Sequence, residues 1–114
     1  MRKLFIMVVT AAMLASCGST KSLYSWYDSE DASYQYTKKL TEDKLKKAMV
    51  QYEKVLKNQK GTRKVVPPGV NAEYGYLLFK AGKKEQGISL MKEEMRLYPE
   101  SEKFISRIVK QLEK

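Results

Sequence analysis

The residues able to do chemistry are few in this 114-residue chain. It contains one cysteine, Cys17, and no histidine, so the commonest general base and metal ligand is absent. The adjacent acids Glu93 and Glu94 point in different directions on a helix and cannot form a facing pair. Lys83-Lys84 would need a desolvating pocket to act, and the scattered glycines form no phosphate-binding loop. We therefore expect no enzyme activity, no metal site and no cofactor.

The first sixteen residues have the organisation of a secretory signal. Met1-Arg2-Lys3 is a short positive region, and the apolar run from Leu4 to Leu14 contains no charged residue. This run is too short to cross a bilayer as a helix, which takes about 20 residues. A buried helix is the alternative, but nothing polar alternates in the run to give it an amphipathic face. We expect residues 1–16 to be a signal peptide.

The end of this signal, Leu14-Ala15-Ser16-Cys17, resembles the lipobox of bacterial lipoproteins. In that family the cysteine thiol receives diacylglycerol and the chain is cut just before it, which implies lipidation of Cys17. Each buried CH2 contributes about 0.8 kcal/mol, so two or more acyl chains anchor a protein where one does not. The alternative is a free or disulfide-forming thiol, but a single cysteine cannot form an internal disulfide.

The residues after Cys17 bear on localisation. In enterobacterial-type sorting an aspartate at position 18 favours the inner membrane, and this chain has Gly18. The lipobox resemblance therefore implies an outer-membrane lipid anchor facing the periplasm, under a rule that differs between lineages. Residues 17–28 are expected to form a lipidated tether with an aromatic end.

The mature chain is small and basic. Without residues 1–16 it has 98 residues, enough for one domain, and 20 basic against 13 acidic residues give a net charge of +7. This charge could favour anionic lipid head groups, acidic cell-wall polymers or an acidic partner, or it could be a solvated surface. Nucleic acid is not an expected partner, because an exported protein rarely meets it.

Residues 29–114 have the periodicity of an all-α domain. The clearest amphipathic helix is Thr41–Lys57, with Thr41 as its cap and an apolar stripe at three- and four-residue spacing. Pro67-Pro68 breaks the helical pattern. The other predicted helices are 29–39, 71–81, which is apolar nearly all round and expected to be central, 84–98 and 102–112, which has Ser101 as its expected cap.

Small residues in the second half resemble a tetratricopeptide repeat, a 34-residue helix pair. Gly82 and Gly87 lie seven and twelve residues after Gly75, and Pro99 lies twelve after Gly87. The small residues would let one helix approach another closely, although Glu94 replaces a small residue of the pattern. A weaker echo 39 residues earlier implies antiparallel helical hairpins, about two repeats, plus a C-terminal capping helix. A plain helical bundle is the alternative.

Aromatic residues supply the candidates for partner binding. Two interpretations stay open for them, an exposed contact face and a cover for the helical core. The candidates are Tyr24, Trp26, Tyr27, Tyr74 and Tyr76.

Two stretches carry a further resemblance, Leu23–Tyr27 and Pro67-Pro68-Gly69, which is followed by Asn71–Gly75. Through these residues the chain is similar to bacterial lipoproteins of the domain-of-unknown-function family 4810. Members often neighbour a lipoprotein similar to the curli secretion channel, which implies a protein-interaction or scaffold role in an envelope assembly. The alternative is a basic cell-wall or anionic-lipid-binding lipoprotein that uses residues 38–64. The partner's identity and the oligomeric state stay open.

Overall fold

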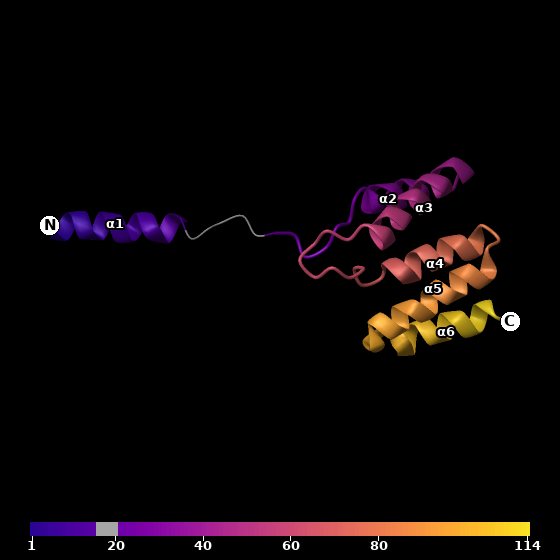
Figure 1. Ribbon diagram of the computed structural model, residues 1–114. Helices are drawn as coiled ribbons and strands as arrows, with labels where there is room; N and C mark the ends of the chain where they lie inside the picture. Colours follow the sequence, from indigo (N-terminus) through magenta and orange to yellow (C-terminus); the bar gives the residue numbers. More distant parts are fainter. Residues whose placement is uncertain (16–20) are drawn as a thin grey trace.

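The structure, a computed structural model, describes residues 1–15 and 21–114 (Figure 1). Within these residues it is all-α, as predicted. The helices are α1 (Arg2–Ala15), α2 (Ser29–Lys38), α3 (Glu42–Lys57), α4 (Val70–Lys80), α5 (Lys84–Leu97) and α6 (Glu102–Leu112), with a 3-10 turn η1 (Pro99–Ser101) between the last two.

Helix α1 is not part of the helical core. Its large side chains Leu4, Phe5 and Met7 are about 70% exposed, and Figure 1 shows it apart from the other helices. Among the described residues, none of the helices combines the length and apolarity that a membrane crossing requires. The predicted cleavage site between Ser16 and Cys17 lies outside the described residues, so the signal peptide stays a prediction.

Helix α3 has the cap and the buried apolar stripe that the sequence predicts. The Thr41 side chain accepts the N–H of Lys44 at 3.3 Å, which confirms the predicted cap. Ala48, Tyr52 and Val55 from the predicted stripe are buried. These three side chains face α2 and α4 and form the centre of the core.

Helix α4 is central, as predicted, since it packs on α3 and on α5. It ends in a turn at Gly82, whose φ of 92° is a conformation that glycine adopts at little cost. There the N–H of Lys83 donates to the carbonyl of Leu78 at 2.9 Å. Gly82 therefore ends the helix.

The close approach expected from the small residues occurs between α4 and α5. A Cβ atom on Gly75 would lie 2.5 Å from the carbonyl oxygen of Gly87, and one on Gly87 would lie 2.3 Å from the carbonyl oxygen of Gly75. The two backbones are thus in direct contact, and α4 and α5 form the most extensive helix pair.

The chain between α5 and α6 differs slightly from the prediction. The last residue of α5 is Leu97 rather than Tyr98, because Pro99 begins the turn η1. Ser101 does occupy the N-cap position of α6, but its hydroxyl donates to the Tyr98 carbonyl at 2.7 Å and does not cap a helix N–H. Helix α6 itself has the predicted bounds.

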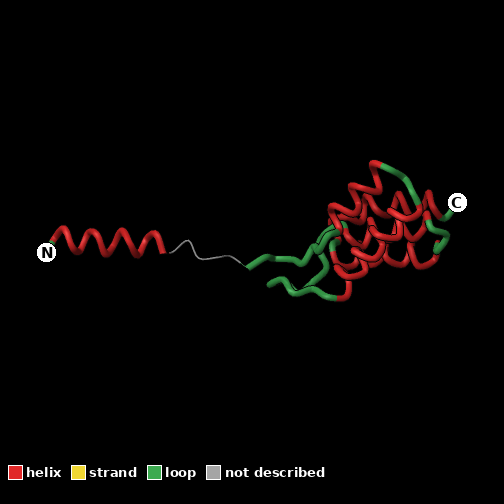
Figure 2. The backbone as a smooth tube through the Cα atoms, turned by 90° about the horizontal axis from the view of Figure 1, so that it is seen from above, coloured by secondary structure: helices red, strands yellow, loops and turns green. Residues whose placement is uncertain are grey.

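Each helix from α2 to α6 packs mainly on its neighbours in sequence, in antiparallel pairs (Figures 1 and 2). One core cluster joins α2, α3 and α4, and a second joins α5 and α6. This arrangement leaves the two outermost helices, α2 and α6, with one packed side each.

Candidate partner-binding surface

The segment before α2 is bound to the helical domain. We call residues 22–28 the N-terminal strip and residues 58–65 the cross loop. The N–H groups of Thr62 and Arg63 donate to the carbonyls of Ser22 and Leu23, at 3.0 and 3.2 Å. A Cβ on Gly61 would lie 2.2 Å from the carbonyl oxygen of Leu23, so glycine is required there. Figure 2 shows the two segments leaving the helices together.

The side chain of Gln59 fixes the strip to the end of α3. Its Oε1 accepts the N–H of Ser25 at 3.0 Å, and its Nε2 donates to the Ser25 and Val55 carbonyls at 2.7 and 2.9 Å. The N–H of Lys60 donates to the Ser25 hydroxyl at 3.0 Å. The aromatic part of the predicted tether is therefore held in a defined place on the domain.

The strip places its three aromatic candidates differently. Tyr24 is half-buried and meets Trp26 edge-on, with the ring centroids 6.2 Å apart. Tyr24 also lies against Tyr98, and burial, together with a hydrogen bond to Tyr24, raises the pKa of Tyr98 to about 12. Trp26 and Tyr27 are 37% and 42% exposed, and the Tyr27 hydroxyl donates to the Asn58 carbonyl at 2.6 Å. Tyr24 thus covers the domain, whereas Trp26 and Tyr27 form part of its surface.

The two candidates on α4 lie on opposite sides of that helix. Tyr74 is 8% exposed and stacks on Tyr52, with the ring centroids 6.1 Å apart, and burial raises its pKa. Tyr76 is 46% exposed, and the Lys80 ammonium lies 5.6 Å from the centre of its ring. Two residues correspond to about 200° around an α-helix, so the pair cannot share a face. Tyr74 belongs to the core, and Tyr76 is available for contact.

An apolar groove lies between α4 and α6, with a volume of about 370 Å³. Phe104 at its edge is 68% exposed, and Tyr76 stands across from it on α4. The floor comes from Met91 of α5. The complete lining is Ala72, Glu73, Tyr76, Met91, Phe104, Ile105 and Ile108.

Sequence reasoning did not identify Phe104 as a surface residue. Phe104 follows the apolar spacing of residues 102–112 together with Ile105 and Val109, which are buried. Helix α6 packs on α5 and η1, and the part of its apolar stripe that carries Phe104 is left uncovered.

A second groove, of about 450 Å³, lies between α2 and α4 and has a mixed polar and apolar lining. Within it the Tyr52 hydroxyl donates to the carboxylate of Glu73, and burial together with this carboxylate raises the pKa of Tyr52. Trp26 and Tyr34 contribute aromatic edges. Because Glu73 lines both grooves, they adjoin one another across α4.

The buried residue Glu94 explains the departure from the repeat pattern. It comes from α5, is 3% exposed, and its Oε1 accepts the N–H of Gly69 at 2.5 Å. The N–H groups of Asn71 and Ala72 lie close enough to favour the charged carboxylate and act to lower its pKa. Glu94 therefore caps the positive N-terminus of α4 from a neighbouring helix. Its Oε2 is buried without a partner among the described residues, and burial raises the pKa of the carboxyl despite the cap.

This raised pKa predicts a pH dependence for Glu94→Gln. The native state holds the Glu94 proton more tightly than the unfolded state, so stability falls as pH rises from the unfolded pKa of 4.5 through the folded one. A glutamine side chain does not titrate, so the variant does not lose stability in this way as the pH rises. We expect the variant to gain stability relative to the original chain as the pH rises above 4.5, in thermal melts followed by circular dichroism.

The control for this prediction is Glu94→Ala, which removes the cap at every pH. It should cost about 1–2 kcal/mol throughout, because the N–H groups at the start of α4 lose their acceptor. A stability difference between Glu94→Gln and the original chain that did not change with pH would contradict the assignment.

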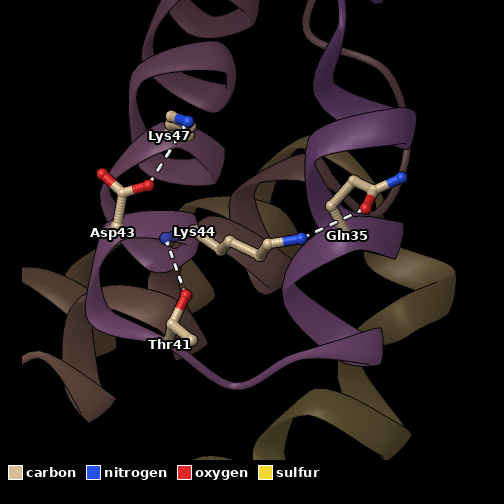
Figure 3. A network of polar contacts seen from close by, with 5 residues as sticks. All are labelled: Gln35, Thr41, Asp43, Lys44 and Lys47. Carbon is tan, nitrogen blue, oxygen red and sulfur yellow. Dashed lines mark hydrogen bonds and ion pairs between the residues drawn. The ribbon is translucent and has the colours of Figure 1, made fainter.

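The basic face of residues 38–64 is partly neutralised. Lys46, Lys47 and Lys57 each lie within 3.6 Å of an acidic residue one helical turn earlier on α3. Figure 3 shows Lys47 beside Asp43, and Lys44 donating to Gln35 of α2 at 3.2 Å. Such exposed pairs contribute little to stability. They do lower the net charge that this face offers to an anionic ligand.

The described residues contain no group of three or more His, Cys, Asp or Glu side chains placed to hold a metal ion. The predicted lipidation site, Cys17, lies outside them. What the described residues do bring together is a row of helices with two adjoining grooves, and a strip of exposed aromatics at one end.

Fold and surface together define a small all-helical domain with side-chain-lined grooves on either side of its central helix. The chain belongs to the family described as Domain of unknown function (DUF4810), which matches residues 23–108. The match begins in the N-terminal strip and ends within α6. This confirms the family expected from the sequence. No curated protein and no solved structure matches the chain.

Proposed function

We propose that this chain is a lipoprotein, anchored through acylated Cys17 in the outer membrane and facing the periplasm, whose helical domain binds a protein partner as a scaffold. The partner is an envelope protein, with a lipoprotein similar to the curli secretion channel as the first candidate. The lipobox resemblance supports the anchor.

The observation that carries the scaffold role is the apolar groove between α4 and α6. Phe104 and Tyr76 leave about half or more of their surface in water at its edges. Exposed aromatic residues beside an apolar recess are the composition of protein-binding hot spots. Single exposed apolar residues are common, but a groove with almost entirely apolar walls marks an interaction site.

We further propose that the domain is built like tetratricopeptide repeats, with α2–α3 and α4–α5 as repeats and α6 as the cap. Packing of each helix on its sequence neighbours supports this, as does the glycine contact between α4 and α5. Helices α2, α4 and α6 would then form one binding face, with Glu73 at its centre. A partner segment could lie across both grooves.

Purification from membranes in mild detergent tests this function. The intact protein should bring down one envelope protein in constant proportion, and this complex should survive 500 mM salt because apolar contacts are not screened. The Cys17→Ser chain cannot be acylated at this position and should no longer be anchored in the membrane. Firm membrane attachment of the Cys17→Ser chain after alkaline washing would contradict the anchor, and absence of envelope proteins from the purified sample would contradict the scaffold.

The alternative, a lipoprotein that binds cell wall or anionic lipid through residues 38–64, predicts the opposite salt response. Binding through lysines collapses as ionic strength rises. The ion pairs on α3 weigh against it.

A further inference from the structure

We infer that the N-terminal strip and the cross loop together form a surface that rests on anionic lipid head groups. This inference builds on the proposed lipid anchor and adds which side of the domain faces the bilayer. It shares Lys60, Arg63 and Lys64 with the range 38–64 of the basic-face alternative, but it uses the end of the domain together with the N-terminal strip and not the lysines along α3.

The charge of this surface suits an anionic membrane. The strip and the cross loop, with Lys21 just before the strip, carry four exposed cationic side chains against one exposed acidic side chain, Asp28, for a net charge of +3. Near an anionic bilayer each such cation strengthens binding about fivefold. The cations are Lys21, Lys60, Arg63 and Lys64.

The same surface carries exposed large apolar side chains. Trp26 and Tyr27 are 37% and 42% exposed, and Leu23 and Val65 are 53% and 42% exposed. Tryptophan and tyrosine favour the level of the lipid head groups, where a ring can be apolar on one side and wet on the other. Cations interspersed with such rings are the composition of an interfacial surface.

The two segments present these side chains together because they are fixed to one another. Backbone hydrogen bonds join Thr62 to Ser22 and Arg63 to Leu23, and Gln59 holds Ser25 on both its N–H and its carbonyl. The surface therefore needs no ordering of a free chain before it can bind, which lowers the entropic cost of docking.

Covalent geometry places this surface close to the anchor. Ser22 follows Cys17 by five positions, and an extended chain spans at most about 3.6 Å per position, or about 18 Å in total. The turns at residues 39–41 and 81–83 lie at the other end of the helices (Figure 1). These turns are farther from Cys17 than the strip is, by the length of α3, which is about 24 Å for its 16 residues. Acyl chains on Cys17 would therefore hold the strip near the head groups.

Trp26 is the only tryptophan of the chain, so its fluorescence reports on this surface alone. The experiment uses protein purified from its host membranes and reconstituted into vesicles of phosphatidylglycerol and phosphatidylcholine, with and without brominated lipid. We expect Trp26 emission to shift to the blue and to be quenched by the brominated lipid. In pure phosphatidylcholine the quenching should be much weaker.

Two triple variants distinguish binding through this surface from a general effect of the protein's net charge. Lys60→Gln, Arg63→Gln and Lys64→Gln together should weaken the docked state roughly 100-fold and abolish the quenching. The matched control replaces three exposed cations elsewhere, Lys39→Gln, Lys83→Gln and Lys110→Gln, and should keep the quenching.

The mass of the purified protein shows independently whether Cys17 is acylated, so the two proposals can fail separately. An acylated protein whose Trp26 stays unquenched in anionic vesicles and open to aqueous iodide would overturn the inference and leave the anchor standing. Equal quenching in both triple variants would also overturn it. Protection of Trp26 by a soluble acidic polysaccharide, without quenching by lipid, would assign the surface to a cell-wall polymer instead.

Discussion

Gly87→Ala is expected to lower the stability of the domain by about 2 kcal/mol, since overpacking typically costs 1–3 kcal/mol. The added methyl group would lie 2.3 Å from the Gly75 carbonyl oxygen and 2.9 Å from the Phe79 nitrogen. Both are backbone atoms and cannot turn aside, so α4 and α5 must move apart. Alanine gains about 1 kcal/mol of helix propensity, but the separation of the main helix pair costs more.

Thermal and urea unfolding by circular dichroism measure this change. A loss of about 2 kcal/mol lowers the midpoint by roughly 10 °C in a domain of this size. Ser89→Ala is the matched control, since it adds an alanine to the exposed side of the same helix and should change stability by less than about 0.5 kcal/mol.

The double variant Gly75→Ala/Gly87→Ala adds a sharper test. Once one methyl group has separated the helices, the second finds space already made, so the combined loss should be less than the sum of the two single losses. Strict additivity, or a Gly87→Ala chain as stable as Ser89→Ala, would show that the helices do not meet at these glycines.

Tyr76→Ala combined with Phe104→Ala is expected to weaken partner binding about 30-fold or more. Truncation of a hot-spot aromatic typically costs at least 2 kcal/mol of binding free energy, which corresponds to about 30-fold in Kd. Phe104 is 68% and Tyr76 46% exposed in the free domain, so its own stability should change much less than the binding does. The amount of envelope protein that co-purifies with the anchored chain measures the effect.

Leu40→Ala combined with Val50→Ala is the matched control for this groove variant. These residues are also apolar and exposed, at 71% and 50%, but they do not line the groove. The control should retain the partner. If both double variants bound the partner equally well, the groove between α4 and α6 could not be the binding site.

The sequence was sufficient for features that depend on neighbouring residues. Thr41 caps α3 because its side chain needs only the next helical turn, and Gly82 ends α4 because its backbone alone permits the required φ. The apolar stripes gave the helices, and most predicted bounds hold to within one or two residues.

The candidate site was less predictable. Tyr74 and Tyr76 lie two positions apart in the same apolar segment, yet Tyr74 is buried in the core and Tyr76 is on the surface. Phe104 belongs to an apolar stripe, which the sequence alone would assign to the core. Only the packing of α5 on α6 shows which part of this stripe is covered. A stripe says that a face is apolar, but the number of helices packed against it decides how much is buried.

By itself the sequence determined the all-α class, the helices and the need for small residues at Gly75 and Gly87, because periodicity, caps and size act locally. The tertiary structure decided the role of Glu94, which caps a helix that begins 24 residues before it, and the fixing of the N-terminal strip to the cross loop. It also opened the groove beside Phe104. These contacts join residues more than twenty positions apart, and no local pattern encodes which distant partner a side chain will meet.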